Sequence, residues 1–212
     1  MSKVGIAIVD YGMGNLRSVQ KAFERLGYAA QITQDPIAIE RAERVALPGV
    51  GAFGAAMANL DRLGITEVVR AAALSGKPFL GICLGMQLLL SESEEQGRFR
   101  GLDVVPGRVV RFFQPEDMNE HTRTLKIPHM GWNTLNIRKR SPFLEDAPNG
   151  ASVYFVHSYY AAPETDVAAA TTDYGIGFCS ALQQDKLFAT QFHPEKSGAV
   201  GLRMLKNFAE VE

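Results

Sequence analysis

Short runs of hydrophobic residues alternate with longer stretches of helical periodicity along the first half of the chain. Each run has the length and apolar composition of a fully buried strand. In the longer stretches, hydrophobic residues recur every three or four positions, which is the spacing of an amphipathic helix. We expect strands at residues 4–9, 29–33, 44–47 and 79–82, and helices at 13–26, 36–43, 55–75 and 84–91. This alternation predicts a mostly parallel sheet flanked by helices, which is the α/β class.

The second half of the chain is richer in strands, and most of them have no helix between them. We expect strands at residues 104–113, 124–137, 152–160, 167–172, 178–182 and 187–192, and a last helix at 197–211. The segment 91–97 is polar and reads as a solvated helix end and loop. Residues 98–140 therefore predict an antiparallel extension of the sheet, within one open α/β domain that spans 1–212.

Composition and charge narrow the class of function. The formal net charge of -1 gives no global attraction to nucleic acid or to anionic membranes, so we expect a small substrate. The sequence has neither a signal-peptide pattern nor an apolar run long enough to span a membrane, and we expect a cytoplasmic protein. The fragment Gly12-Met13-Gly14 lacks the third glycine of a dinucleotide-binding turn. Cys83 and Cys179 make no disulfide framework, and no metal-ligand spacing occurs, so we expect no cofactor.

Cys83 lies where the strand 79–82 turns into a helix. In a nucleophile elbow, a sharp turn at such a corner lifts a reactive side chain clear of the sheet, and small residues on either side let strand and helix approach closely. Gly81 and Gly85 provide those small residues. Cys83 is therefore a candidate nucleophile, and the alternative is a buried cysteine that only fills space.

A glycine-rich loop, residues 48–54, follows the third predicted strand. Glycines allow a backbone to approach another group closely. One interpretation is an oxyanion hole in which a peptide N–H of the loop joins the N–H of Leu84 above Cys83. The alternative is an ordinary connection between a strand and a helix.

His193 and Glu195 flank Pro194 at the end of the last predicted strand. If the backbone is extended there, both side chains point to the same side, and the carboxylate can orient the imidazole as a general base. His157 is the rival base, but it has no acidic residue nearby in the sequence and lies in a β-rich run. His121 and His129 carry no other chemical signal.

The segment 81–87 and the run His193-Pro194-Glu195 together resemble the triad-type, class I glutamine amidotransferases. The resemblance covers nearly the whole chain and implies a flavodoxin-like sheet. It also implies that the Cys83 thiolate attacks the side-chain amide of glutamine, while His193, oriented by Glu195, gives a proton to departing ammonia and then activates water. With the candidate oxyanion donors included, the positions expected to bind glutamine are Gly49, Val50, Gly51, Leu84, Gln87, Ser158 and Tyr159.

Within that family, residues 10–18 and 128–133 resemble the glutaminase subunits of imidazole glycerol phosphate synthases of histidine biosynthesis. This resemblance implies a heterodimer with a separate cyclase subunit, a (β/α)8 barrel, that receives ammonia through a channel. That cyclase converts a ribulosyl-aminoimidazole nucleotide to imidazole glycerol phosphate and an aminoimidazole carboxamide nucleotide. The residues expected near the partner, with a possible part in gating, are Tyr11, Asn15, Trp132 and Lys196. Their alternative role is surface or packing.

Three other functions stay open at this stage. One is the glutaminase of another synthase, against which the segment 10–18 argues. Another is a free-standing cysteine hydrolase of the same fold, which would need no partner. The third is a catalytically silent binding module of flavodoxin-like fold.

Overall fold

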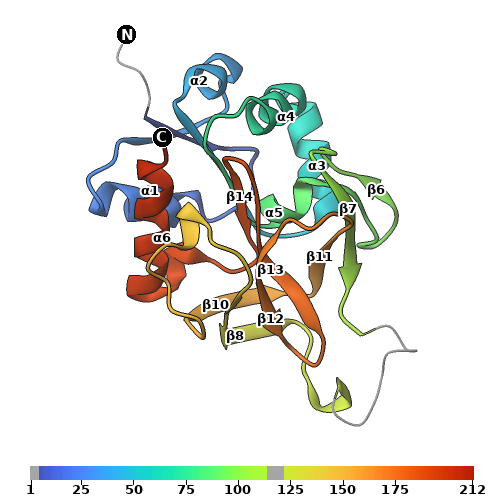
Figure 1. The fold of residues 1–212 in the computed structure, drawn as a ribbon. Coiled ribbons are helices and arrows are strands. Elements are labelled where there is room, and N and C mark those ends of the chain that lie inside the picture. The colour runs from blue at the N-terminus through green and yellow to red at the C-terminus, as the bar shows by residue number, and fades with distance from the viewer. Residues whose placement is uncertain (1–4, 114–121) are drawn as a thin grey trace.

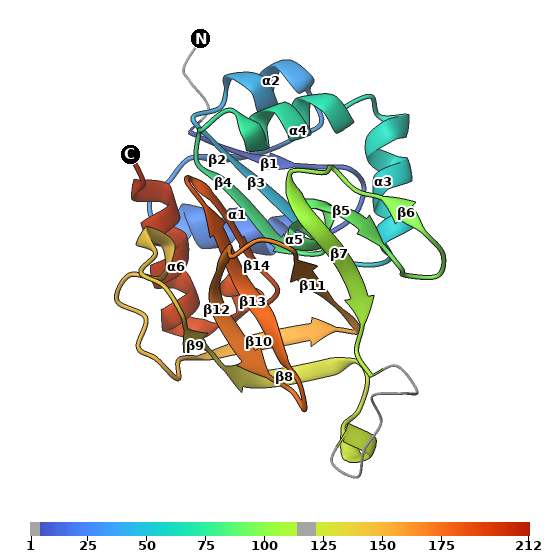
Figure 2. The same ribbon diagram turned by 45° about the vertical axis from the view of Figure 1, so that its right-hand side comes forward.

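The computed structural model describes residues 5–113 and 122–212 (Figure 1). Its largest sheet has eight strands in the order β2-β1-β3-β4-β14-β13-β12-β9, all labelled in Figure 2. The pairs from β2 to β14 are parallel, and those from β14 to β9 are antiparallel. These strands are β1 (Ile6–Val9), β2 (Ala30–Thr33), β3 (Arg44–Gly49), β4 (Phe79–Cys83), β9 (Asn136–Ile137), β12 (Ala168–Asp173), β13 (Gly177–Gln184) and β14 (Leu187–Thr190). The predicted mostly parallel sheet with an antiparallel extension is confirmed, in a flavodoxin-like strand order.

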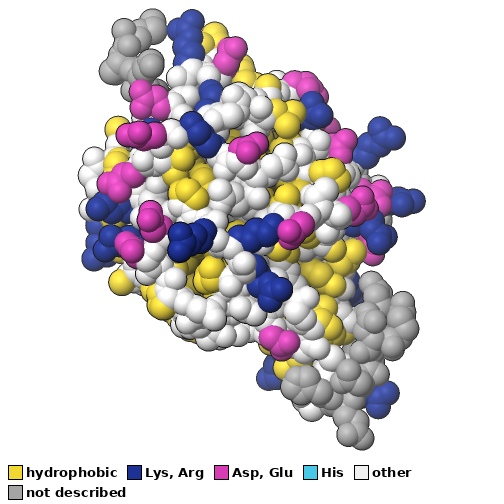
Figure 3. Space-filling model, in the orientation of Figure 1, with side chains coloured by type: hydrophobic (Ala, Val, Ile, Leu, Met, Phe, Trp, Pro, Cys, Tyr) yellow, Lys and Arg dark blue, Asp and Glu magenta, His cyan; other side chains and the backbone are white. Residues whose placement is uncertain are grey.

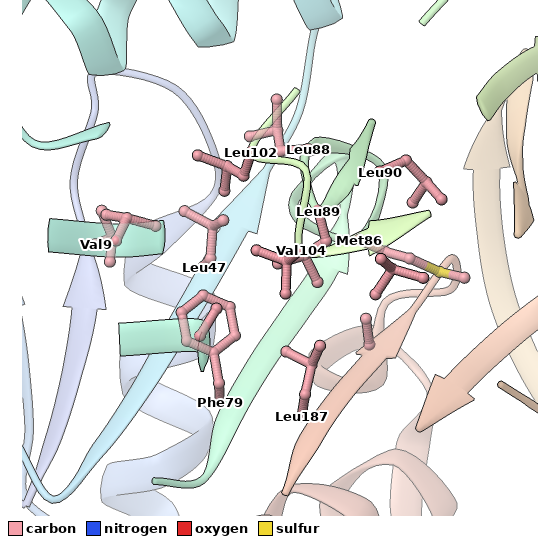
Figure 4. Packing of buried hydrophobic residues seen from close by; sticks show 14 of the residues in the cluster. Val9, Leu47, Phe79, Met86, Leu88, Leu89, Leu90, Leu102, Val104 and Leu187 are labelled. Atoms are coloured by element: carbon pink, nitrogen blue, oxygen red, sulfur yellow. The ribbon is translucent and has the colours of Figure 1, made fainter. Parts of the chain in front are cut away.

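Helices cover both faces of this sheet (Figure 2). On one face lie α1 (Leu16–Arg25) and α6 (Gly198–Glu210), and on the other lie α2 (Pro36–Arg41), α3 (Phe53–Arg62), α4 (Thr66–Leu74) and α5 (Leu84–Leu88). Side chains of each buried strand alternate between the two faces, as pleating requires. In β1, Ile6 and Ile8 pack toward α1 and α6, whereas Ala7 and Val9 join the opposite cluster, part of which is shown in Figure 4. The sheet is therefore the centre of two hydrophobic layers.

Two smaller sheets stand beside the main one. Four strands form the order β11-β7-β5-β6, and β10 pairs antiparallel with β8. Their bounds are β5 (Leu90–Ser93), β6 (Phe99–Arg100), β7 (Val105–Arg111), β8 (His129–Thr134), β10 (Ser152–His157) and β11 (Tyr159–Pro163). Short 3₁₀ turns occur at Thr122–Thr124, Pro142–Leu144 and, as η4, at Pro194–Lys196.

Most of the predicted elements are present, with small shifts at their ends. The side chain of Asp35 caps α2 by accepting a hydrogen bond from the N–H of Ile37, and Pro36 occupies the first helical position. The predicted helical region 55–75 is two helices, because Gly64, with a φ of +66°, lies in the left-handed region where an α-helix ends. The strands β13 and β14 follow one another in the chain and pair antiparallel as a hairpin.

Two expectations are wrong. The helix after Cys83 ends at Leu88 instead of continuing to 91, and the next residues form β5, which pairs in parallel with β7. The buried run of Leu88, Leu89 and Leu90 suits either a helix or a strand, so periodicity could not decide between them. Residues 98–140 do not extend the main sheet except through β9, because β7 and β8 pair within the smaller sheets.

The face seen in Figure 3 carries basic and acidic side chains interspersed among neutral ones. This mixture agrees with the formal net charge of -1. Among the helices that the structure describes, none combines the length and the apolar character needed to cross a membrane.

Candidate active site

Three neighbouring strands bring the candidate residues to one edge of the main sheet. The strands β3, β4 and β14 are parallel neighbours, and Gly49 at the end of β3 lies opposite Cys83 at the end of β4. His193 follows three residues after the last residue of β14. Open α/β sheets place their ligands outside the carboxyl ends of the strands, which is where these residues meet.

Cys83 lies on a sharp corner between β4 and α5. Its φ of 56° and ψ of -109° are unusual for a residue with a side chain, and such strain is found at functional sites. The corner depends on close approach of backbones, since a Cβ on Gly85 would lie 1.7 Å from the carbonyl oxygen of Leu47. A Cβ on Gly81 would lie 2.9 Å from the carbonyl oxygen of Gly85. The predicted strand-turn-helix geometry is therefore present, and glycines make it possible.

His193 and Glu195 form a buried pair. The Nδ1 of His193 donates to Oε1 of Glu195 over 2.8 Å, and the two side chains are 3% and 1% exposed. We expected an extended backbone at both residues, but only His193 has one. Glu195 lies within the 3₁₀ turn η4, and this turn brings its carboxylate to the imidazole. Nε2 of His193 makes no hydrogen bond to the described residues that meets ordinary geometric limits, so it is the nitrogen left for proton transfer.

The charge state of His193 is set by opposing effects. Burial lowers the pKa of its imidazole, but Cys83 and Glu195, which stabilise the charged ring, together raise that pKa to about 10. The imidazolium is therefore the stable form at neutral pH. It lies beside the sulfur of Cys83, an arrangement that suits a cysteine nucleophile with a histidine acid and base.

A cavity of about 350 Å³ opens over Cys83. Its wall contains every residue expected to bind glutamine except Gly49. The lining residues are Val50, Gly51, Cys83, Leu84, Gln87, Glu95, Pro128, Val156, His157, Ser158 and Tyr159. The cavity therefore brings together segments of the chain that are far apart in the sequence.

Gly49 is not in this wall; it lies opposite Cys83 at the end of β3, where there is no room for a side chain. A Cβ on Gly49 would lie 2.2 Å from the hydroxyl of Tyr11 and 2.8 Å from Cβ of Leu84. Gly51 has a φ of +99°, which few residues with a side chain adopt. The local geometry therefore requires glycine at both positions 49 and 51.

Gln87 uses both of its N–H groups inside the protein. Its Nε2 donates to the carbonyl oxygen of Tyr159 at 2.9 Å and to Oε1 of Gln191 at 3.0 Å. Its own Oε1 is left as an acceptor on the side chain that lines the cavity. A ligand group that donates hydrogen bonds can pair with this oxygen.

Glu95 was missed by the sequence analysis, which placed it in a solvated loop. Its Oε2 accepts a 2.7 Å hydrogen bond from the N–H of Phe53 at the start of α3, and the residue lines the cavity. A carboxylate in that position can bind a ligand ammonium group. The acidic run around it resembles an exposed helix end, so the sequence offered no signal that one member faces inward.

His157 lines the cavity as well, but both of its ring nitrogens are occupied. Nδ1 donates to the carbonyl oxygen of Tyr159 at 2.8 Å, and Nε2 accepts from Nδ1 of His129 at 3.0 Å. Burial lowers the pKa of His157 to about 3 and that of His129 to about 4, so both rings are neutral. This geometry favours His193 over His157 as the base, and His121 lies outside the described residues.

The four residues expected near a partner lie in different environments. Trp132 on β8 is 58% exposed and packs edge-on against Tyr154, its neighbour across the strand pair. The Nζ of Lys196 lies 5.8 Å from the centre of the Tyr154 ring. Asn15 is exposed at the start of α1. Tyr11 is fully buried below the cavity, so it cannot touch a partner directly in this conformation.

Comparison with known proteins yields one family and a consistent set of relatives. The family model described as glutamine amidotransferase class-I matches residues 7–211. The chain is 57% identical to the imidazole glycerol phosphate synthase subunit HisH of Geobacter metallireducens, covering 96% of this chain and 97% of that protein. It is 56% identical to the subunit of the same name from Syntrophotalea carbinolica, covering 97% and 100%.

Solved structures show the same fold at lower identity. A crystal structure of a glutamine amidotransferase superposes with a TM-score of 0.72 at 20% identity, covering 98% of this chain and 100% of that one. The structure of PurLQS from Thermotoga maritima gives a TM-score of 0.72 at 18% identity, with 98% of both chains covered. The fold is therefore shared well beyond the close relatives.

Proposed function

The chain belongs to the class I glutamine amidotransferase family, and from this premise we propose that it is the glutaminase subunit of an imidazole glycerol phosphate synthase. It hydrolyses glutamine to glutamate and ammonia and supplies the ammonia to a cyclase subunit in histidine biosynthesis. The observation that carries this function is Cys83, held on a strained elbow beside the His193–Glu195 pair and under a cavity of about 350 Å³. The close relatives named HisH support the choice of synthase.

In the proposed reaction, the Cys83 thiolate attacks the side-chain carbonyl carbon of glutamine. The carbonyl oxygen becomes negative and accepts hydrogen bonds from the N–H of Leu84 and from a peptide N–H of the 49–51 loop. The tetrahedral intermediate collapses as the C–N bond breaks, and Nε2–H of His193 gives its proton to the departing ammonia. The remaining species is a γ-glutamyl thioester on Cys83.

The second half of the reaction uses the same residues in reverse. His193, now neutral, takes a proton from water, and the hydroxide attacks the thioester carbonyl. The C–S bond breaks with its electron pair on the sulfur, which restores the thiolate and the imidazolium, and the γ-carboxylic acid that forms loses its proton to water and leaves as glutamate. Glu195 keeps the Nδ1 proton of the ring in place throughout, because it accepts the hydrogen bond from that nitrogen.

The cavity wall is suited to holding the amino-acid part of glutamine. Oε1 of Gln87 can accept from an N–H of the substrate, and the Glu95 carboxylate can pair with its α-ammonium group. Ser158 and Tyr159 also line the cavity and offer further polar atoms. Charge pairing of this kind selects an amino acid over an uncharged amide.

The partner that we propose is a cyclase with a (β/α)8 barrel, which docks near the exposed side of β8 and receives ammonia through a channel. Met130 and Trp132 on this strand are 63% and 58% exposed, which is unusual for large apolar side chains. The single domain 1–212 would act in the cytoplasm as one half of a heterodimer. A free-standing hydrolase of this fold would not need such a surface.

The experiment that tests this function compares two nitrogen sources in the reconstituted complex. Cys83→Ala should abolish product formation from glutamine and preserve formation from added ammonium salt, because only the release of ammonia passes through the sulfur. Ser180→Ala, a change at a buried residue that the proposed reaction does not use, serves as the matched control. Continued glutamine hydrolysis by the Cys83→Ala variant would show that another residue is the nucleophile.

A further inference from the structure

Gln191 follows β14 directly, is 0% exposed and has no role in the mechanism described so far. Its Nε2 lies 3.7 Å from Sγ of Cys83, within hydrogen-bond range for sulfur. We propose that Gln191 stabilises the thiolate of Cys83 by donating this hydrogen bond, in the resting enzyme and again when the thioester breaks. The inference rests on the proposed function, in which Cys83 is the nucleophile.

The orientation of the Gln191 amide follows from its neighbours. The carbonyl oxygen of Tyr159 can only accept, so the nitrogen of Gln87 must face it, as the 2.9 Å contact requires. The same nitrogen of Gln87 then faces Oε1 of Gln191 at 3.0 Å. With its oxygen turned toward Gln87, Gln191 presents its nitrogen to the sulfur.

A backbone hydrogen bond fixes the position of Gln191, and the contact with Gln87 fixes the rotation of its side-chain amide. The N–H of Gln191 donates to the carbonyl oxygen of Ser180 on β13 at 2.9 Å. Since the side chain is fully buried, no bulk water competes for its hydrogen bonds, and a buried donor left without an acceptor would be costly. The sulfur is the acceptor that the structure provides.

The thiol and the thiolate of Cys83 make different hydrogen bonds with the groups around Sγ. As a thiol, Cys83 can donate to the carbonyl oxygen of Val156, although that contact is long at 3.9 Å. As a thiolate, the sulfur can only accept, and Gln191 then supplies a buried donor. When the C–S bond of the thioester breaks, the electron pair goes to sulfur, so this donor stabilises the leaving group.

The chain of contacts also joins substrate binding to the nucleophile. Gln87 lines the cavity and holds Gln191, and Gln191 holds the sulfur. A substrate that pairs with Oε1 of Gln87 therefore binds the same side-chain amide whose Nε2 orients Gln191. Gln191 in turn is the hydrogen-bond donor to the thiolate.

The test measures the rate at which iodoacetamide alkylates Cys83 between pH 5 and 9 in the full chain. Among the described residues, the titratable groups around the sulfur are Tyr11, His193 with its partner Glu195, and His157 and Glu95, which line the same cavity as Cys83. Burial raises the pKa of Tyr11 far above this range, that of His157 is about 3 and that of His193 about 10. The charges of Tyr11 and His157 are therefore constant over this range, whereas the charge of His193 is coupled to that of the sulfur. Burial also raises the pKa of the Cys179 thiol to about 12, so mass spectrometry can follow Cys83 alone.

Gln191→Leu should lower the alkylation rate of Cys83 at pH 7 by roughly tenfold, since a hydrogen bond to a charged group typically contributes about that much to its stability. The rates of variant and parent should converge at high pH, where both sulfurs are ionised. Gln191→Glu keeps an acceptor for Gln87 and replaces the donor by a carboxylate, so its rate at pH 7 should be lower still. Ser180→Ala, at a buried residue of the adjacent strand, should match the parent.

An unchanged pH profile in folded Gln191→Leu and Gln191→Glu would overturn the inference. So would equal slowing at every pH, which indicates distortion of the site instead of a change in thiolate stability. If Gln191→Leu does not fold, the Gln191→Glu profile alone decides. Alkylation needs no glutamine, so a shifted profile in a chain that fails to hydrolyse glutamine even with the ligand-loaded cyclase would reject the proposed function and keep the role of Gln191.

Discussion

Two buried hydrogen bonds act on the residues that carry the proposed reaction. Glu195 accepts from Nδ1 of His193, and Gln191 donates to Sγ of Cys83. The bond to Glu195 holds a proton on the imidazole, and the bond from Gln191 supports negative charge on the sulfur. The proposed reaction starts from the ion pair of the Cys83 thiolate and the His193 imidazolium.

At this scale we predict that His193→Ala harms glutamine turnover more than Glu195→Gln does. Loss of His193 removes the proton carrier, and general acid-base catalysis typically contributes ~10² to 10⁴ in rate. The Glu195→Gln side chain can still accept from Nδ1 through its amide oxygen, so orientation is partly kept. The measurement is the rate of glutamate formation by each variant in the complex with its partner.

His157→Ala is the matched comparison, because it removes the other histidine of the cavity wall. Normal turnover of His193→Ala together with an inactive His157→Ala variant would move the base role to His157.

The sequence predicts some of these residues and not others, for a physical reason. The sequence predicts the triad because its members have reactive or titratable side chains and lie at recognisable places, a strand-helix corner for Cys83 and a strand end for His193 and Glu195. Gln191 is an uncharged residue 108 positions from Cys83 in the chain, and only the folded sheet brings them together. Glu95 lies in an acidic run, and its inward orientation depends on a contact with α3.

At the scale of the elements, the site depends on how closely α5 approaches β3. The contact of α5 with β3 places the Cys83 elbow beside the glycine-rich loop at the end of β3. Gly85 permits this contact because it has no side chain. The sequence indicates the elbow by its glycines, but it does not reveal that α5 has only five residues before β5 begins. The pairing of β5 with β7, which ends that helix early, involves a segment farther along the chain.

We predict that Gly85→Ala destabilises the protein strongly. The added Cβ would lie 1.7 Å from the carbonyl oxygen of Leu47, which belongs to the backbone of a central strand and cannot move easily. Overpacking typically costs 1–3 kcal/mol, and we expect a loss of about 3 kcal/mol or more in the free energy of unfolding, measured with urea.

Gly177→Ala is the control, since a Cβ there has no atom within 4 Å and its φ is not in the left-handed region. Equal stability of the Gly85→Ala and Gly177→Ala variants would contradict the close packing of α5 against β3.

At the scale of the whole molecule, the two smaller sheets join the active site to the exposed side of β8. His129 on β8 and His157 on β10 bond to one another, and His157 also holds the carbonyl of Tyr159 beside Gln87. The sequence predicted strands in this half but not their sheets. Strand propensity is local, whereas the choice of partner strand depends on residues far along the chain.

The buried histidine pair predicts that the protein loses stability in mild acid. In the unfolded chain both histidines have a pKa near 6.5, whereas in the folded protein the values are about 4 for His129 and about 3 for His157. Between these limits the unfolded state binds more protons, so stability is complete above pH 6.5 and declines as the pH falls. Each histidine contributes a slope of up to about 1.4 kcal/mol per pH unit. Urea denaturation should therefore show a loss of about 3 kcal/mol between pH 7 and pH 5.

The control is His193→Ala. The raised pKa of His193 gives stability that is present below pH 6.5 and is lost as the pH rises toward 10, so its removal should enlarge the loss between pH 7 and 5 by no more than about 1 kcal/mol. His129→Gln should reduce that loss by about half. Equal stability of the parent at pH 7 and pH 5 would show that the histidine pair is not held neutral.

We propose that this chain is a glutaminase that supplies ammonia to a partner subunit, and its dependence on that partner can be measured. The rate of glutamate formation is measured for the chain alone, with the cyclase, and with the cyclase carrying its nucleotide ligand. The 49–51 loop lies between Tyr11 and the cavity, and its glycines allow a peptide N–H to turn toward or away from the oxygen above Cys83. Loss of one oxyanion donor typically costs ~10² to 10³ in turnover, so we predict a rise of about two decades or more with the loaded cyclase. Full activity of the chain alone would contradict this account and favour a free-standing hydrolase.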